Sequence, residues 1–478
     1  MKTSSAQLWL FVICSLLLNH TVLQAVDKAS PKGRPNVLIF VIDDLGRTDI
    51  GVDGSTFHET PYLDALARSG VRFTNFYSAH PVCSPTRAAL MTGKVPQRLG
   101  ITDWIHPKSG IALPASETTL GEAFQQQGYQ TAYLGKWHLG ESDVDLPTKH
   151  GFEWIKGVNR AGQPASYYYP YRRQGEGVTV WDVPDFSGAR ETDYLTDVLS
   201  SAAIDFLQLR DRERPFLLCF GHYAVHTPIQ PPAKLPEKYR NKRQARYGDA
   251  AAQTITAPND SVSRGRQDDT DYAAMMENLD QNVGRVLVAL EKSGDRQNTI
   301  VVLTSDNGGL CTLSGQRPGP TCNLPWRSGK GWTYEGGIRI PTYISWPDHL
   351  TPATIDVPGY SSDFYPTLLE LCGLPLQPQQ HRDGRSLVSA LNGQPDAGLL
   401  TRSLAWYYPH NHGSGHRPSA AIRRESWKLI YDLNDKQCQL YDLAHDSIES
   451  IDLSATHPDK VKLLTDELLR WIEETKPE

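Results

Sequence analysis

Two kinds of hydrophobic pattern alternate along most of the chain. Short, nearly continuous apolar runs end in polar residues or glycine, which is typical of strands that a sheet buries on both faces. Longer segments between them repeat their apolar residues every three or four positions, as an amphipathic helix does. The predicted strands are residues 36–44, 71–79, 130–138, 215–223 and 298–308, and the predicted helices are residues 60–70, 119–129, 193–210 and 271–294.

This order of elements predicts the fold class. Strands joined through helices lie parallel, because each connection crosses one face of the sheet. We therefore expect an α/β fold in which a mixed, mostly parallel sheet is sandwiched by helices. Residues 240–269 interrupt the pattern, and their polar composition predicts a long surface loop or an insertion.

The pattern changes after about Pro375. Short strand-like pieces and a final amphipathic segment follow, at residues 402–410, 419–433, 438–443 and 457–475. Strands without helices between them are typical of an antiparallel sheet. We predict a main α/β domain at residues 26–374 and a smaller domain at residues 375–478, with an antiparallel sheet and one helix.

The first 25 residues have the features of a secretory signal peptide. One lysine precedes an apolar run from Leu8 to Leu18, and Ala25 is small enough to precede a cleavage site. The run is too short to span a bilayer, which takes about 20 apolar residues, and no later stretch is long enough. We expect residues 1–25 to be removed, the protein to reach a periplasmic, secreted or other extracytoplasmic compartment, and no membrane span.

Composition limits the classes of partner. The chain is 39% hydrophobic and 21% charged, with a formal net charge of −6. A mildly acidic protein without a basic segment gives no support to nucleic-acid or anionic-membrane binding. An anionic substrate must therefore be held by a local cluster of cations.

Six of the seven cysteines lie beyond the expected signal peptide. Cys311 and Cys322 flank a loop rich in glycine and proline, and we expect them to pair with each other in an oxidising compartment. Cys219 and Cys372 lie in apolar runs and are predicted to be buried free thiols.

Acidic and amide side chains gather where two predicted strands end. Asp43 and Asp44 end the first, and Asp306 and Asn307 end the last. Ligands of open α/β sheets bind beyond the carboxyl ends of the strands. Adjacent buried carboxylates are costly unless a cation compensates them, and four oxygen donors suit Ca²⁺ or Mg²⁺. Each residue could instead cap a helix or turn, but two such pairs favour the metal.

Lysines and histidines follow the same strand ends. Lys136 and His138 point to one side if their strand continues between them, His222 and His226 follow the next strand, and Lys330 lies in a glycine-rich segment. A cation beside an imidazole suits an anionic substrate that needs proton transfer. The alternative is that these are solvated lysines and histidines satisfied within the fold.

A single cysteine occupies a turn-like segment, HPVCSPTRAAL, from His80 to Leu90. A disulfide for Cys83 would leave Arg87 unexplained, thiolate phosphatases place their arginine farther from the cysteine, and a zinc site needs more ligands than His80 supplies. Cys-x-Pro-x-Arg followed by AALMTGK resembles the motif of type I sulfatases, members of the alkaline phosphatase superfamily.

The resemblance covers nearly the whole mature chain. The blocks that carry it, in order, are PNVLIFVIDDLG, TPYLDALARSGVRFTNFYS, GYQTAYLGKWHLG, HGFEWIKG, VVLTSDNGG, YEGGIRIPTYISWP and LYDL. The resemblance implies an alkaline-phosphatase-like fold and hydrolysis of a sulfate ester to an alcohol and inorganic sulfate. It also implies that a formylglycine-generating enzyme oxidises Cys83 to formylglycine.

The resemblance further assigns roles by position. A formylglycine hydrate would attack sulfur with one hydroxyl, and loss of the proton from the other would release sulfate and restore the aldehyde. One Ca²⁺ would be held by Asp43, Asp44, Asp306 and Asn307, with oxygens from position 83 and from the sulfate. Arg87 would hold the hydrate and the metal, Lys136 and Lys330 would bind sulfate, His226 would protonate the leaving oxygen with help from Lys330, and His138 would act as the base in the elimination. His222 is the second candidate for the acid.

Two segments are candidates for substrate recognition. Residues 406–429 contain His410, His412 and His416, and we hypothesise that His410 and His412 contact hydroxyls of a sugar that carries the sulfate. The alternative is a histidine-rich surface loop. The aromatic stretch at residues 165–173 combines rings and arginines, which also suit a sulfated glycan.

Two other functions remain open at this point. A phosphodiesterase or phosphonate monoester hydrolase of the same superfamily uses a similar metal cradle. The chain could also be a catalytically silent binding protein for sulfated glycans, if Cys83 stays a thiol. We expect the substrate to be a sulfated small molecule or glycan.

Overall fold

The computed structural model describes residues 33–173, 177–315 and 317–477. The expected signal peptide, residues 1–25, lies outside this part of the chain. Among the described residues, no helix combines the length and apolar character needed to cross a bilayer.

A central sheet has the strand order β12-β2-β11-β9-β1-β6-β4-β5. β1 (Asn36–Ile42) lies in its middle and pairs in parallel with β6 (Phe216–Gly221) and β9 (Thr299–Ser305). β4 (Gln130–Gly135) continues the parallel set, whereas β11 (Thr342–Ser345) is antiparallel to both of its neighbours. The predicted mixed, mostly parallel sheet is confirmed, and the parallel strands end at one edge.

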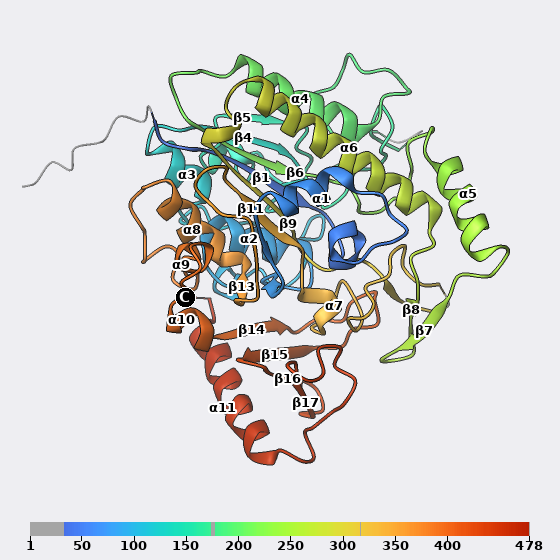
Figure 1. Ribbon diagram of the computed structural model, residues 1–478. Coiled ribbons are helices and arrows are strands. Elements are labelled where there is room, and N and C mark those ends of the chain that lie inside the picture. The colour runs from blue at the N-terminus through green and yellow to red at the C-terminus, as the bar shows by residue number, and fades with distance from the viewer. Residues whose placement is uncertain (1–32, 174–176, 316, 478) are drawn as a thin grey trace, which may run out of the picture.

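Helices cover both faces of this sheet because β1 is apolar on both sides. Val37 and Ile39 pack into one core, whereas Leu38 and Phe40 pack into the other. The first core is covered by α2 (Cys83–Thr92), α3 (Leu120–Gln125) and α8 (Phe364–Leu371), and the second by α1 (Pro61–Arg68), α4 (Leu195–Leu209) and α6 (Thr270–Lys292). Figure 1 shows α4 and α6 running side by side across the second face.

A second, antiparallel sheet lies below the first in Figure 1. It consists of β14 (Ser403–Tyr408), β15 (Ser419–Arg424), β16 (Trp427–Asp432) and β17 (Cys438–Asp442). One face packs against α11 (Pro458–Glu474) and the other against the main domain. The predicted C-terminal sheet and helix are therefore confirmed.

A buried charge cluster, which we call the junction cluster, also joins the C-terminal sheet to the main domain. Lys428 Nζ on β16 lies 2.9 Å from Glu335 Oε1 and 2.7 Å from Glu449 Oε1. Glu335 Oε2 accepts a hydrogen bond from Tyr77 at 2.8 Å, and the Glu335 backbone N–H donates to Glu449 Oε2 at 2.7 Å. The cluster fixes the smaller sheet against the main domain.

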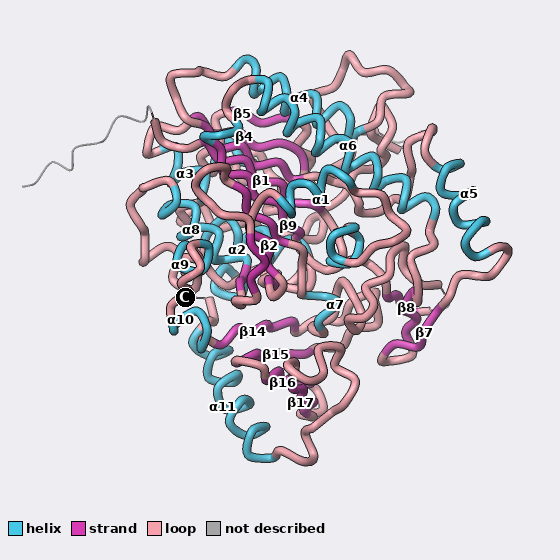
Figure 2. Tube along the Cα trace, in the orientation of Figure 1, coloured by secondary structure: helices cyan, strands magenta, loops and turns pink. Residues whose placement is uncertain are grey.

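Of the two alternatives for residues 240–269, a long surface loop or an insertion, the loop is wrong. The segment contains most of α5 (Pro236–Tyr247), then β7 (Thr254–Ala257) and β8 (Ser261–Arg264), which joins β10 (Thr312–Ser314) in a small sheet. α5 buries little besides Tyr239, and β8 turns serines inward, so neither element has an apolar pattern. Figure 2 shows both elements at the right edge of the molecule.

The predicted strand at residues 130–138 ends early. Gly135 has φ of 73°, and a Cβ there would lie 2.1 Å from the carbonyl oxygen of Gly221, so only glycine fits this turn. Lys136 and His138 therefore follow the strand instead of alternating along it. Between β5 (Trp154–Lys156) and α4, the described residues are almost entirely loops and turns (Figure 2).

The remaining elements are short. They are β2 (Val71–Phe73), β3 (Phe76–Tyr77), β12 (Ala353–Ile355), β13 (Gly359–Tyr360), α7 (Glu335–Ile338), α9 (Val388–Leu391), α10 (Ala397–Thr401), and 3-10 helices at Arg47–Asp49, Gly51–Asp53, Pro96–Leu99, Pro147–Lys149, Arg296–Asn298 and Ser361–Asp363. The predicted strand at residues 71–79 is thus divided into β2 and β3.

The predicted disulfide between Cys311 and Cys322 is wrong, because both residues are free thiols. Cys311 Sγ instead lies 3.1 Å from the carbonyl oxygen of Ser328, to which the thiol donates. Cys219 and Cys372 are buried free thiols, as predicted.

Candidate active site

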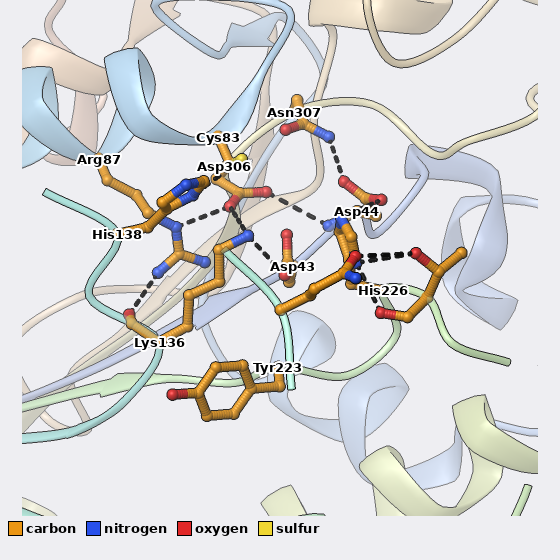
Figure 3. A network of polar contacts seen from close by, with 12 residues as sticks. Asp43, Asp44, Cys83, Arg87, Lys136, His138, Tyr223, His226, Asp306 and Asn307 are labelled. Atoms are coloured by element: carbon orange, nitrogen blue, oxygen red, sulfur yellow. Dashed lines mark hydrogen bonds and ion pairs between the residues drawn. The ribbon is translucent and has the colours of Figure 1, made fainter. Parts of the chain in front are cut away.

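The ends of β1, β4, β6 and β9 bring polar residues together at one edge of the sheet (Figure 3). The residues that converge there are Asp43, Asp44, Lys136, His138, His226, Asp306 and Asn307, and they meet Cys83 and Arg87 from α2 and Lys330 from a glycine-rich loop. The parallel order of the strands explains this convergence, since it places their carboxyl ends side by side.

Cys83 is the first residue of α2 and is 3% exposed. Its Sγ lies 3.3 Å from His138 Nδ1, while His138 Nε2 lies 3.0 Å from the carbonyl oxygen of Ile105. A carbonyl can only accept, so Nε2 carries the proton and Nδ1 faces the thiol as an acceptor. Burial raises the pKa of the Cys83 thiol, although Lys136 and Lys330 oppose the shift.

Each buried cation at the site lies against a carboxylate. The contacts are Arg87 Nε to Asp306 Oδ2 at 2.8 Å, Lys136 Nζ to Asp43 Oδ2 at 2.7 Å, and Lys330 Nζ to Asp44 Oδ1 at 2.7 Å. Burial alone would raise the pKa of Asp44. The positive charges of Lys330, His226 and Lys136 have the larger effect, so the pKa of Asp44 lies below its ordinary value. For Asp43, burial prevails over Lys136 and raises the pKa well above its ordinary value.

The oxygen donors at this edge fit a hard divalent cation. Asp43 Oδ1 and Asn307 Oδ1 are buried and have no hydrogen-bond partner. Oxygens of Asp43 and Asp44 and a ring nitrogen of His226 lie within 4.8 Å of one another. Unpaired buried oxygens are costly, and a Ca²⁺ or Mg²⁺ ion prefers such ligands. Three of the four residues predicted from the strand ends, Asp43, Asp44 and Asn307, thus present oxygen atoms of the kind that such an ion binds.

The two histidines that follow β6 have different surroundings. His226 lines a cavity of about 480 Å³ above Cys83, and its Nε2 lies 3.6 Å from Asp44 Oδ2. His222 stacks on Phe220, with ring centroids 3.8 Å apart, and neither ring nitrogen has a polar partner. Burial lowers the pKa of both to about 3. Only His226 is placed to meet a substrate.

Three loops wall the cavity. One follows the 3-10 helix at Pro96–Leu99, the second connects β5 to α4, and the third joins β14 to β15 in the smaller domain. They contribute Asp103, Trp104 and His106, then Gln163 and Trp181, then Asn411 and His412. No sequence motif marks these residues of the first two loops, and sequence reasoning missed them.

The predicted substrate residues separate in the structure. His412 lines the cavity, and a Cβ on Gly331 would lie 2.1 Å from its Nδ1, so the ring rests against the loop that carries Lys330. His410 does not line this cavity, and its Nε2 lies 3.0 Å from Thr102 Oγ1. His416 is buried and stacks on Tyr408.

The aromatic stretch at residues 165–173 supports the site from behind. Tyr167 is fully buried, and its hydroxyl donates to the carbonyl oxygen of Tyr223 at 2.6 Å and lies 2.9 Å from that of His226. Tyr171 is also fully buried. These two rings pack in the core and do not line the cavity, so neither of them contributes to the glycan-binding surface that the sequence suggested.

Comparison with known proteins agrees with this geometry. The sulfatase family model matches residues 35–374, and the model for the C-terminal region of N-sulphoglucosamine sulphohydrolase matches residues 327–476. The chain belongs to the sulfatase family. It is a sulfuric ester hydrolase and a type I sulfatase of the alkaline phosphatase superfamily.

Relatives match this sulfatase over most of its length. N-acetylgalactosamine-6-sulfatase of Homo sapiens is 32% identical over 395 residues, which cover 78% of this chain and 68% of the relative. Uncharacterized sulfatase YdeN of Escherichia coli (strain K12) is 28% identical and covers 94% of this chain and 87% of its own. The crystal structure of Ps i-CgsB has a TM-score of 0.76 at 29% identity and covers 92% of both chains.

Proposed function

We propose that this sulfatase removes sulfate from a sulfated carbohydrate, that position 83 acts as formylglycine, and that one Ca²⁺ is bound beside it. The observation that carries the proposal is the group of buried residues at the bottom of the cavity, which we call the site floor. There Cys83 faces His138, and the cations Arg87, Lys136 and Lys330 each lie against a carboxylate. Asp43 Oδ1 and Asn307 Oδ1 in the same group have no hydrogen-bond partner. Anionic sulfate needs the cations, and a metal needs the oxygens.

The buried thiol supports modification at position 83. A thiol whose pKa is raised by burial carries little thiolate and is a poor nucleophile at neutral pH. Formylglycine supplies what the thiol lacks, namely a hydrated aldehyde that attacks sulfur and later expels sulfate as the aldehyde reforms. Cys83 begins α2, so the nucleophile is held at a fixed position on a rigid element.

The surrounding side chains divide the remaining tasks. Lys136 and Lys330 draw sulfate oxygens to the floor and stabilise negative charge as the S–O bond breaks. His138, with its proton held on Nε2 by Ile105, accepts a proton at Nδ1. Asp43, Asp44, Asp306 and Asn307 would hold Ca²⁺, and Arg87 keeps Asp306 in place through the 2.8 Å ion pair.

His226 is proposed to protonate the leaving oxygen. Its Nδ1 lies 2.8 Å from the carbonyl oxygen of Thr227, so the neutral ring carries its proton there, and Nε2 needs a second proton to act as an acid. A bound sulfate monoanion favours that second proton by attraction. Lys330, whose pKa is raised by Asp44 despite burial, stays charged and supports the developing alkoxide.

Similar proteins support a carbohydrate substrate. One relative is named N-acetylgalactosamine-6-sulfatase, and a structure of Ps i-CgsB at 28% identity, with a TM-score of 0.75, is a complex with k-i-k-neocarrahexaose. The cavity above Cys83 has indole rings and hydrogen-bonding side chains, which suit a sugar. We also propose export by the signal peptide at residues 1–25 and maturation by a formylglycine-generating enzyme.

Two measurements test the proposal. Mass spectrometry of the tryptic peptide Phe73 to Arg87, from protein made in its native host, should detect formylglycine at position 83. The same protein should release inorganic sulfate from sulfated mono- or oligosaccharides. A peptide that contains only the plain thiol, in protein that nonetheless hydrolyses the ester, would rule out this mechanism.

The rival phosphate chemistry has a direct test. A phosphonate monoester hydrolase of Agrobacterium radiobacter has a TM-score of 0.65 at 21% identity, a likeness of fold alone. Sulfate and phosphate esters of one leaving group should be compared with the same preparation. If a phosphodiester with this leaving group is hydrolysed faster than the sulfate ester, our choice of substrate is wrong. If the protein binds sulfated glycans but hydrolyses no ester, the silent binding protein is favoured.

A further inference from the structure

The cavity above Cys83 is poor in positive charge away from its floor. Among the described residues that line it, Lys330 is the one lysine or arginine, and its Nζ is 2.7 Å from Asp44 at the floor. The described upper wall of the cavity is built from indoles, histidines, two amides and one carboxylate, Asp103. A substrate that carries a second anionic group would find no cation there to receive it.

Asp103 is held firmly in this wall. Its Oδ1 accepts hydrogen bonds from the Tyr408 hydroxyl at 3.0 Å and from the Trp104 backbone N–H at 2.8 Å, and its side chain is 19% exposed. Oδ2 lies 3.5 Å from His106 Nε2. A fixed, partly desolvated carboxylate accepts hydrogen bonds from hydroxyl groups and repels another anion.

Flat rings surround the carboxylate. Trp104 and His106 contact each other with ring centroids 3.6 Å apart, and Trp181 lines the cavity from the loop between β5 and α4. Indole faces pack against apolar surface, such as the C–H face of a sugar ring. This combination suits a ring that is apolar on its faces and has hydroxyl groups at its edge.

His412 does not replace the missing cations. Burial, with Lys330 adding repulsion, lowers the pKa of His412 to about 4, so its ring is neutral at neutral pH. Asn411, beside it, is exposed and uncharged. The wall of the smaller domain therefore gives hydrogen bonds without positive charge.

We infer that the sugar bound in this cavity is neutral apart from the sulfate that is cleaved. A hexose with hydroxyl groups should be accepted, whereas a uronic acid, or a sugar with a second sulfate in the same ring, should be rejected by Asp103. The inference rests on the proposed function and deepens it by naming the substrate class. It assigns Asp103 as the residue that decides between neutral and anionic sugars.

Matched substrates test the inference. The formylglycine-containing protein should be assayed at pH 8, where histidines are ordinarily neutral, with pairs of sulfated monosaccharides that bear the ester at the same ring carbon. The two members of a pair differ only in whether the exocyclic carbon is a hydroxymethyl group or a carboxylate. We expect kcat/KM to be higher for the neutral member by about 10-fold to 100-fold, the range expected for one like-charge contact.

An aryl sulfate in the same assay separates two kinds of failure. No sulfate release from the aryl sulfate or from any sugar would reject the proposed function. Sulfate release with equal or faster turnover of the carboxylated sugar would reject this inference and leave the proposed function intact.

Two variants test the role of the wall charge. Asp103→Asn should reduce the preference for the neutral sugar by about tenfold. Asn411→Lys adds a cation to the same cavity without removing a buried contact, and should shift the ratio of kcat/KM values in the same direction. Asn298→Lys, at the opposite edge of the sheet beside the start of β9, is the matched control and should leave the ratio unchanged. An unchanged ratio in both cavity variants would overturn the assignment.

Discussion

The site floor and the junction cluster both bury lysines and carboxylates, but they treat their oxygen atoms differently. In the junction cluster, both oxygens of Glu335 and Glu449 Oε2 accept hydrogen bonds. Glu449 Oε1 accepts none, but it forms an ion pair with Lys428 at 2.7 Å. At the floor, Asp43 Oδ1 and Asn307 Oδ1 have no hydrogen-bond partner.

This difference distinguishes a cluster that stabilises the fold from one that binds a ligand. A cluster whose polar atoms satisfy one another stabilises the fold, because breaking it leaves a buried charge alone. A cluster with unpaired oxygens costs stability and persists where a ligand completes it. We therefore expect variants of the two clusters to have opposite effects on stability and activity.

Loss of the junction lysine should have the largest effect. Lys428→Met leaves Glu335 and Glu449 facing each other without a cation, and should destabilise the protein by about 3–5 kcal/mol. Urea unfolding measures this loss, with Lys436→Met in an exposed turn as the control. The folded fraction should keep its kcat, and a lower kcat without loss of stability would contradict the structural role of the cluster.

Replacing a carboxylate of the site floor should instead lower the activity much more than the stability. Asp43→Asn removes a proposed metal ligand and should lower kcat/KM for a sulfate ester by about 100-fold or more. The melting temperature should fall less than that of Lys428→Met, because burial makes the charged form of Asp43 costly and has raised its pKa, which offsets part of the cost of leaving Lys136 without this partner. Asp435→Asn on the surface is the control. Retained activity would remove Asp43 from the proposed metal site.

The junction cluster should also make stability depend on pH. Burial, with repulsion from Glu335, outweighs Lys428 and raises the pKa of Glu449 from 4.5 to about 7. Between these two pH values the folded protein therefore holds a proton that the unfolded chain has lost. The resulting contribution to the free energy of unfolding is complete below pH 4.5 and is lost as the pH rises through 7.

Glu449→Gln tests this dependence. The free energy of unfolding of the wild type should fall from pH 5 to pH 8 by at most about 3 kcal/mol more than that of the variant. Urea titrations at both pH values measure the difference, and Glu425→Gln on the surface should behave as the wild type does. Equal slopes for wild type and Glu449→Gln would show that Glu449 does not titrate in this range.

The smallest expected effect distinguishes the two loop histidines. His412→Ala removes a side chain from the cavity wall and should raise KM for a sulfated sugar about threefold to tenfold. His410→Ala, whose side chain contacts Thr102 outside the cavity lining, should change KM less than about twofold. Equal effects would mean that the loop acts as a whole.

Much of the fold and of the floor was accessible from the sequence. β1 has apolar residues on both faces, so its pattern predicts a buried parallel strand, and Asp43 and Asp44 then mark its carboxyl end. Cys83 and Arg87 were accessible through their motif. These features depend on neighbours in the chain, which is why the sequence displays them.

Other features depend on residues far apart in the chain. α5 and β8 were missed because they bury few apolar side chains, and the pairing of β8 with β10 depends on contacts between serine and threonine. Asp103, Trp104 and Trp181 lie in loops without a motif, so nothing in the sequence marked them.

The sequence by itself determined the central parallel strands, the family motif and the identity of the charged groups, because hydrophobic period and residue chemistry are local properties. Only the tertiary structure decided which of those groups meet. It separated His226 from His222 by turning one toward the cavity and stacking the other on Phe220. It also placed Asp103 as the one carboxylate among the described residues of the cavity wall, because three loops distant in sequence meet over one edge of the sheet.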